Sequence, residues 1–475
     1  TGSAVVEQEG DKVFDKTPSK FDRSIEPNLG KAPLLNPPSI WTSSLANGMD
    51  VYGIESNELP LVNFSITLKG GHMLDNAAKA GVASMLSGIM MEGTKNKTPE
   101  ELEDAIGQLG ANINMFTSND RITISANCLE RNYQKTLELV TEILLEPRWD
   151  EKEFDILKSK TVNDIKRRSS SPNAIANDVM SKALYGNNIL GIPSIGTVES
   201  VTSITLDDLK DFYTSNFSPK AANFHIAGSI TKEKAEASLA KLATWSGDAV
   251  SFPDIDYPAV PQEPIVYFVD VPNAKQSYIM ISRLTVDSNS EDIYPIQVAN
   301  YKLGSGSGGQ LFAVLREEKQ YTYGASSSAS RGIQKGRWTA FSSVKTNVTK
   351  EALETFKEVI GNYGVNYTQE QLDGTKNALI KQNTRRYETT RALLGLLQNI
   401  SSNNLPLDYI DQQQQVLQNM TVEDVKGLVQ EYMNLENMYF VIVGDKETQL
   451  DRLKVVGVGD PIEVDKKGNP VTPSM

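Results

Sequence analysis

Few side chains in this sequence combine a catalytic type with a useful spacing. The 475 residues include two histidines, His72 and His225, and one cysteine, Cys128. Two metal-binding histidines on one helix need the i, i+4 spacing, and a thiolate site needs several cysteines. The sequence therefore predicts no zinc site of the usual kind. A lone cysteine also excludes an intramolecular disulfide.

Two serines in the apolar segment 81–94 (GVASMLSGIMMEGT) are the next candidates for chemistry. Ser84 and Ser87 could be nucleophiles only with a base within hydrogen-bond reach and an oxyanion hole. His72 is the candidate base, but nothing fixes it near Ser84, and the segment has no Gly-x-Ser-x-Gly motif. We do not expect serine hydrolysis. His225, in a strand-like Asn-Phe-His-Ile-Ala, is expected to be a packed or strand-edge residue.

A glycine-rich run at residues 304–309 (GSGSGG) precedes the segment QLFAVLREEKQYTYG. No Lys-Ser or Lys-Thr follows the glycines, so a phosphate-binding P-loop is not expected. The segment predicts a short amphipathic helix, a polar turn and a strand rich in Tyr, Thr and Ser. By residue type alone, the run is typical of a flexible loop. Arg316 would then pair with a neighbouring glutamate, and Tyr323 would pack in the sheet.

Three segments resemble the pitrilysin/insulinase family of zinc peptidases in sequence and order: residues 81–94, 191–219 (GIPSIGTVESVTSITLDDLKDFYTSNFSP) and 315–324 (LREEKQYTYG). In that family the first segment is a helix that carries His-x-x-Glu-His and closes on Gly-Thr. By this resemblance, the first His falls on Ser84, the Glu on Ser87 and the second His on Gly88. The resemblance implies a family member, or half of a longer family chain, that lacks the zinc motif.

The same resemblance implies roles for residues outside this segment. The third zinc ligand of the family, a Glu on a later helix, corresponds roughly to Asp164, which we expect to be an ordinary helix-surface acid. Family members hold the substrate carbonyl with an Arg and a Tyr seven residues later, the spacing of Arg316 and Tyr323. A permanent cation and a phenolic donor can stabilise an oxyanion in a water-poor cavity.

The glycine run lies where the non-catalytic subunit of the similar mitochondrial processing peptidase has its substrate-binding loop. Glycine leaves the backbone accessible and free. By this resemblance, contact with an extended peptide substrate, or gating of the chamber, would fall to Gly304, Gly306, Gly308 and Gly309.

The elements that must position these residues follow from apolar periodicity and capping signals. Thr98, Pro99 and Glu101 form a helix start with a capping box. Strands are expected at 49–57, at 61–71 and as a pair within 112–128, and amphipathic helices at 133–145 and 151–168. This mixture favours an α+β fold over a doubly wound sheet.

An internal repeat predicts two related modules. A capped helix beginning at Thr205 leads to a strand ending at Gly228, and the pattern recurs from Thr421 to Gly444, 216 residues later in both cases (421 − 205 and 444 − 228). We expect an arm or linker at 1–40, modules at 41–250 and 265–458, a proline-rich linker at 251–264 and a tail at 459–475. Each module should be a mostly antiparallel sheet packed with helices, as in the processing-peptidase type of metallohydrolase fold.

The charge and hydropathy of the chain exclude other classes of function. Its net charge of −13 argues against nucleic-acid binding, which needs clustered Lys and Arg. No run of 18 apolar residues is present, so no membrane span is expected. Resemblance to bacterial family members implies a periplasmic or otherwise extracytoplasmic location.

Two functions stay open at this point. In the first, the chain is the non-catalytic subunit or C-terminal half of a zinc peptidase. It would be inactive alone and bind no cofactor, because the zinc lies on a homologous partner. The residues FDRSIEPNLGKAPLLNPPSIW favour this function because they resemble the connector before the second half of long family members. The partner would form a heterodimer with this chain, or alternatively the chain forms a homodimer. In the second, the chain is a catalytically inert peptide-binding or assembly module.

Overall fold

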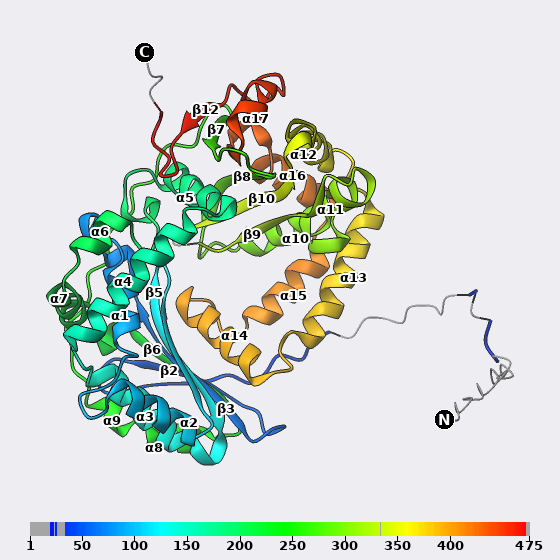
Figure 1. Cartoon of the computed structure of the whole chain (residues 1–475). Helices are drawn as coiled ribbons and strands as arrows, with labels where there is room; N and C mark the ends of the chain where they lie inside the picture. Colours follow the sequence, from blue (N-terminus) through cyan, green and yellow to red (C-terminus); the bar gives the residue numbers. More distant parts are fainter. Residues whose placement is uncertain (1–19, 23, 26–33, 333, 472–475) are drawn as a thin grey trace, which may run out of the picture.

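Two six-stranded sheets form the framework of the molecule (Figure 1). The computed structural model describes residues 20–22, 24–25, 34–332 and 334–471. The strand order is β1-β2-β6-β3-β5-β4 in the first sheet and β12-β7-β11-β8-β10-β9 in the second. The strands are β1 (Trp41–Ser44), β2 (Asp50–Glu55), β3 (Leu61–Lys69), β4 (Asn112–Thr117), β5 (Arg121–Leu129), β6 (Ala222–Gly228), β7 (Ile265–Asp270), β8 (Gln276–Asp287), β9 (Thr322–Ser330), β10 (Lys335–Lys345), β11 (Tyr439–Gly444) and β12 (Ile462–Val464).

Most neighbouring strands in both sheets run antiparallel. Among the described strands, β2 is parallel to β6 in the first sheet, and β7 is parallel to β11 and β12 in the second. Except at the β1 and β12 edges, strands that correspond in chain order occupy the same place in each sheet. The predicted α+β fold, with two modules of mostly antiparallel sheet, is confirmed.

Helices surround both sheets (Figure 1). None of those in the described ranges is long and apolar enough to cross a membrane. In the first module they are α1 (Val82–Ile89), α2 (Pro99–Gln108), α3 (Tyr133–Leu145), α4 (Glu151–Arg168), α5 (Pro172–Tyr185), α6 (Val198–Ser203), α7 (Leu206–Asn216), α8 (Lys232–Ser238) and α9 (Ala240–Ala243). In the second they are α10 (Ile293–Gly304), α11 (Gln310–Phe312), α12 (Thr349–Tyr363), α13 (Gln369–Arg386), α14 (Thr390–Ser402), α15 (Tyr409–Asn419), α16 (Val422–Tyr432) and α17 (Lys446–Leu453).

The capping signals in the sequence are confirmed as helix starts. Thr98 accepts a hydrogen bond from the backbone of Glu101 in a capping box that begins α2. Thr205 and Thr421 begin α7 and α16 with the same kind of box, and both helices have 11 residues. The side-chain oxygen of a capping residue satisfies a backbone N–H that has no partner within the helix. Helices α3 and α4 also match their expected bounds.

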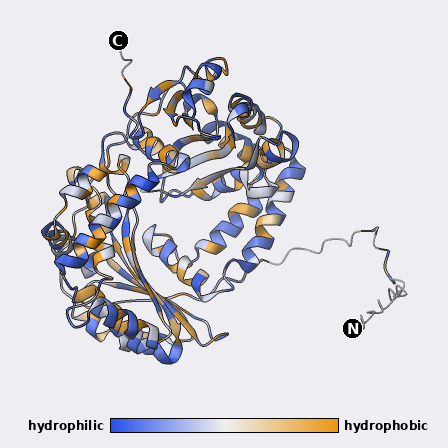
Figure 2. Ribbon diagram, viewed as in Figure 1, coloured by the Kyte–Doolittle hydropathy of each residue, from blue (hydrophilic) through white to orange (hydrophobic). Residues whose placement is uncertain are grey.

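One face of each sheet packs against helices of its own module. In the first module, Phe64 of β3 stacks on Phe224 of β6 with ring centroids 6.0 Å apart, and Tyr133 of α3 meets Phe64 edge-on at 5.4 Å. In the second module, Trp338 of β10 is fully buried in the core cluster. Burying such a side chain stabilises the fold by about 1.5–3 kcal/mol. Figure 2 shows hydrophobic residues alternating with hydrophilic ones along the helices.

The other face of each sheet is covered by a helix from the opposite module. Helix α5 of the first module packs on β8 and β11 of the second sheet, and α14 of the second module packs on β2, β3 and β6 of the first. Leu397 of α14 is fully buried in a cluster with Ile54 and Ala227. Central strands with two apolar faces need cover on both sides. The exchange of helices therefore ties the two modules together.

The segments outside the two sheets also make contacts where they are described. Most of the expected arm, including much of FDRSIEPNLGK, lies outside the described residues. At its end, Leu35 exchanges two hydrogen bonds with the side chain of Gln414 on α15, at 3.0 and 3.1 Å. Residues 251–261 have no regular secondary structure. Strand β12 lies within the expected tail and pairs with β7.

Replacing Leu397 by Ala tests the exchange of helices. We expect the free energy of unfolding to fall by about 2–5 kcal/mol, because the variant leaves a cavity under α14. Hydrogen exchange should also accelerate in β3 and β6 of the first sheet. Leu407→Ala is the control, since this side chain is 48% exposed. Unchanged protection of β3 and β6 in Leu397→Ala would contradict the structural role of α14.

Candidate functional site

Ser87, one of the two serines that stand at zinc-motif positions by resemblance, makes local hydrogen bonds. Ser84 is half-buried and Ser87 is buried, and both lie on one face of α1. Ser87 Oγ lies 2.6 Å from Thr117 Oγ1 at the end of β4, and Thr117 Oγ1 donates to the carbonyl oxygen of Ala83 at 2.7 Å. Neutral hydroxyls tied to one another in this way are poor zinc donors.

The third motif position, Gly88, is closed off by helix α4. A Cβ atom placed on Gly88 would stand 3.0 Å from both methyl carbons of Leu157. A histidine at this position could therefore enter only if Leu157 moved. The packing of α1 on α4 therefore leaves little room for a side chain at this position.

Asp164 lies on the surface of α4, as expected of an ordinary helix acid. Its Oδ1 accepts from Arg167 Nη2 at 2.9 Å, and the Arg167 side chain is 83% exposed. Asp164 comes seven residues after Leu157, about 10 Å further along the helix. Throughout the ranges that the structure describes, no group of three His, Cys, Asp or Glu side chains could hold a metal ion.

A buried carboxylate, that of Asp75, holds the first turn of α1. Asp75 accepts from the backbone N–H groups of Gly81 and Ala83, both at 2.9 Å, and so caps the helix from outside its sequence. Its Oδ2 also lies 2.9 Å from His72 Nδ1, and both side chains are fully buried. His72 Nε2 points at the carbonyl oxygen of Ile192 at 2.9 Å. Both ring nitrogens are thus engaged away from Ser84, which removes the base that a serine hydrolase would need.

His225 is a packed residue on a central strand of the first sheet, so the alternative of a strand-edge position is wrong. Its Nε2 lies 2.6 Å from Ser401 Oγ of α14, and its ring stacks on Tyr52. Burial, helped by the positive charge of Arg121, lowers the pKa of His225 to about 3. A neutral imidazole held between hydroxyl groups is a structural contact between β6 and α14.

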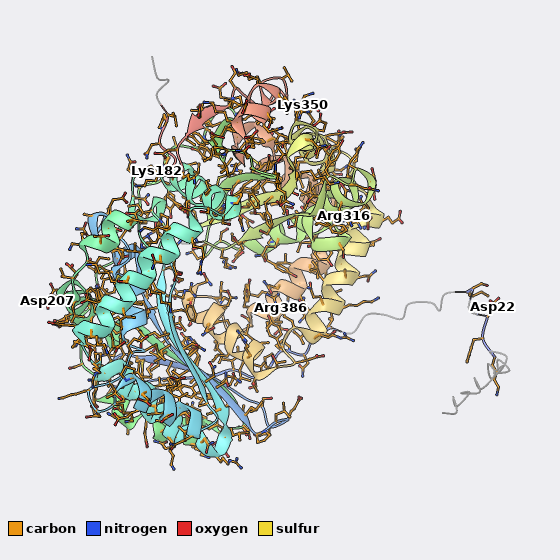
Figure 3. All side chains as sticks on the ribbon, viewed as in Figure 1. Asp22, Lys182, Asp207, Arg316, Lys350 and Arg386 are labelled. Atoms are coloured by element: carbon orange, nitrogen blue, oxygen red, sulfur yellow. The ribbon has the colours of Figure 1, made fainter. Side chains whose placement is uncertain are left out.

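Arg316 and Tyr323 lie close together on the second module. The Arg316 guanidinium carbon is 5.7 Å from the centre of the Tyr323 ring, within the range of a cation–π contact. Tyr323 is 82% exposed, so it does not pack in the sheet. Arg316 has no ion pair with any residue that the structure describes, neighbouring glutamates included. Figure 3 shows Arg316 beside α11.

The backbone that presents this pair is irregular on both sides. Arg316 belongs to a π-helical turn, Ala313–Glu318, that follows α11. Gln320 has a φ of +56°, a conformation that side chains rarely adopt. The pairing of β9 with β10 then shifts register between Ser342 and Val344, beside Tyr323. π-turns, positive φ values and bulges are frequent where a fold aims functional side chains.

The four glycines of the glycine-rich run differ in their surroundings. A Cβ on Gly304 would stand 1.9 Å from Ser327 Oγ, so this glycine allows α10 to pack on β9. Gly309 is buried, and a Cβ there would meet the backbone of Ser305 at 2.9 Å. Gly306 (φ +54°) and Gly308 are exposed with open space around them. The run forms a compact turn in which Gly306 and Gly308 are accessible to a ligand.

The structure divides the predicted site residues between two places. Ser84, Ser87, Gly88 and Asp164 belong to the first module, on α1 and α4. Arg316, Tyr323 and the glycine turn belong to the second. No described hydrogen bond or ion pair joins the two groups. Sequence reasoning missed a set of polar cavities along β9 that contain Arg331, Arg385 and Arg386. The pair Arg385-Arg386 is visible in the sequence, but it resembles the usual positive end of a helix.

Comparison with known proteins defines the class of this fold. The model of the insulinase family (peptidase family M16) matches residues 53–198, and that of the peptidase M16 inactive domain matches residues 203–379. The two matches together cover more than half of the chain, in the order that its motifs predict. The chain belongs to the M16 peptidase family, and the match to the domain described as inactive runs from the end of α6 in the first module into α13 of the second.

Individual relatives agree with this assignment. An uncharacterized zinc protease, YmxG, of Bacillus subtilis is 24% identical over 63% of this chain and 72% of its own length. A non-peptidase homolog, YmxG, of Helicobacter pylori is 19% identical over 83% of this chain and 91% of its own. The crystal structure of a peptidase M16 inactive domain from Pseudomonas fluorescens superposes with a TM-score of 0.80 and 25% identity, covering 86% of this chain and 98% of that one.

Removing the Asp75 carboxylate tests what holds α1. Asp75→Ala leaves His72 without its partner and two helix N–H groups without an acceptor, so we expect a loss of about 3–5 kcal/mol in urea unfolding. Asp164→Ala is the matched control. It breaks a surface pair, which contributes about 1 kcal/mol or less. Equal stabilities of the two variants would contradict the capping role of Asp75.

Proposed function

We propose that this chain is the non-catalytic subunit or half-chain of a two-part zinc peptidase. It contributes Arg316 and Tyr323 to a zinc site that a homologous partner carries. The observation behind the proposal is the placement of this pair. An exposed tyrosine beside an unpaired arginine adds little to the stability of the fold, yet an irregular backbone presents both. Such backbone irregularities persist where they serve function.

The chemistry assigned to this chain is stabilisation of the oxyanion. The residues at its own degenerate motif do not fit a zinc ion, so the metal belongs to the partner. When a peptide carbonyl is attacked, negative charge develops on its oxygen. The Arg316 guanidinium and the Tyr323 hydroxyl group can both donate hydrogen bonds to that oxygen.

The exposure of Tyr323 indicates that this residue needs a partner subunit before it can stabilise an oxyanion. In bulk water a hydrogen bond to an oxyanion stabilises it little, because water competes and the dielectric constant is high. A partner wall that excludes water would strengthen both donors. We propose a heterodimer rather than a homodimer, because two copies of this chain would both lack the zinc ligands.

A second function is a peptide-binding module without catalysis. Two observations favour it: the name of the Helicobacter pylori relative, a non-peptidase homolog, and the cavities along β9. Such a module would retain peptide binding whether or not Arg316 is present.

Reconstitution with a zinc-bearing homologue from the same organism separates the two functions. We expect no stoichiometric zinc and no peptide cleavage from this chain alone, and chelator-sensitive cleavage from the mixture. Arg316→Ala should lower the turnover of the mixture about 100- to 1,000-fold, the size of losing an oxyanion donor. Tyr323→Phe should have a smaller effect.

The control for this experiment is Arg167→Ala, which removes an exposed arginine of the first module. Full turnover with Arg316→Ala would favour the binding module. Chelator-sensitive cleavage by this chain alone would contradict both functions.

A further inference from the structure

Three cavities form a continuous groove along strand β9. The first, of about 810 Å³, lies between α10, β9 and α13 and includes Gly306. The second, of about 410 Å³, shares Gln297, Ala329 and Arg386 with it. The third, of about 620 Å³, shares Arg331 and Asn399 with the second and reaches the β4–β5 turn of the first module. We call the first two cavities the β9 groove, together with the part of the third cavity that borders Arg331 and Asn399.

The charge of the β9 groove is opposite to that of the chain. Its first two cavities contain Arg331, Arg385 and Arg386, and no Asp or Glu is among their lining residues. The whole chain has a net charge of −13. In the described part of the chain, none of the three arginines forms an ion pair. The third cavity adds Arg121, which forms an ion pair with Asp120, so this cavity contains an acidic residue as well.

Two of these guanidinium groups are held by neutral contacts. Arg331 donates to the carbonyl oxygen of Ser288 and, at 3.2 Å, to Tyr409 Oη, and it lies over the Tyr409 ring at 5.7 Å. Arg386 lies over the ring of Tyr387 at 5.7 Å. Neutral acceptors and aromatic rings orient a guanidinium without cancelling its charge. Figure 3 shows Arg386 at the end of α13 beside α15.

The dimensions of the groove suit an extended chain better than a compact anion. Strand β9 has nine residues and is about 30 Å long. The arginines are spread over two successive cavities. The remaining lining is rich in hydroxyl and amide groups, including Ser328, Ser330 and Gln297. These groups can pair with a peptide backbone, while the arginines pair with carboxylates.

We infer that the β9 groove binds an extended peptide through acidic side chains. This inference rests on the proposed function, because it takes the bound peptide to be the substrate of the two-part peptidase. It adds the class of substrate: segments rich in Glu or Asp. The net charge of the chain, −13, disfavours non-specific binding of such a peptide elsewhere.

Fluorescence anisotropy of the full chain alone, without a partner, tests the inference. The probe is a labelled nonapeptide of alternating Glu and Ala, and its neutral counterpart has Gln in place of Glu. We expect the acidic peptide to bind about tenfold or more tightly than the neutral one, and less tightly as salt is raised. The double variant Arg385→Gln, Arg386→Gln should weaken binding of the acidic peptide by a similar factor.

The matched control is the double variant Lys381→Gln, Arg391→Gln. It removes the same charge from exposed positions on α13 and α14 that do not line the first two cavities. Equal weakening in both double variants, equal affinity for the two peptides, or tighter binding of inorganic phosphate or short DNA would overturn the inference. Peptide binding is measured on this chain alone and cleavage on the mixture with the zinc-bearing homologue, so failed peptide binding and failed reconstitution of cleavage are distinguishable outcomes.

Discussion

The structure depends on a packing constraint. Both sheets have two apolar faces, and the helices of each module cover just one face of that module's sheet. Helices α5 and α14 cross over to cover the remaining faces. Without the exchange, strands such as β6 and β11, which are buried along most of their length, would expose apolar side chains to water. The crossing also places α14 across a cavity from Ala329 and Ser330 of β9. The same contact that stabilises the first sheet therefore builds one wall of the β9 groove.

The loss of the zinc ligands has not removed what holds α1. The helix is fixed by Asp75 at its first turn and by packing against α4 at Gly88, and neither contact involves a metal. A metal site can thus be lost from this module while the fold stays intact. Tyr323 and Arg316 lie on the other module, on a turn whose irregular backbone is independent of α1. Each of the two groups of residues has its own local support.

The sequence predicted most of the fold because its signals are local. The capping box at Thr98, the paired boxes at Thr205 and Thr421, and the periodicity of α3 and α4 depend on neighbours within a few residues. The exchange of α5 and α14 could not be predicted, because the apolar face of a helix shows that the helix packs on something but not on which sheet. Three other features were missed for a similar reason: the Asp75 cap, the pairing of His225 with Ser401 and the β9 groove. Asp75 lies outside the helix that it caps. The other two features join residues that are far apart in the sequence.

The central claim is that Tyr323 faces the zinc site of a partner. Photocrosslinking from a benzophenone side chain in place of Tyr323 tests it most directly, in a mixture with the zinc-bearing homologue. The account predicts a crosslink to the His-x-x-Glu-His helix of that homologue, which a tight-binding peptide inhibitor should suppress. A crosslink to another surface of the homologue, or no crosslink to the homologue at all, would contradict it.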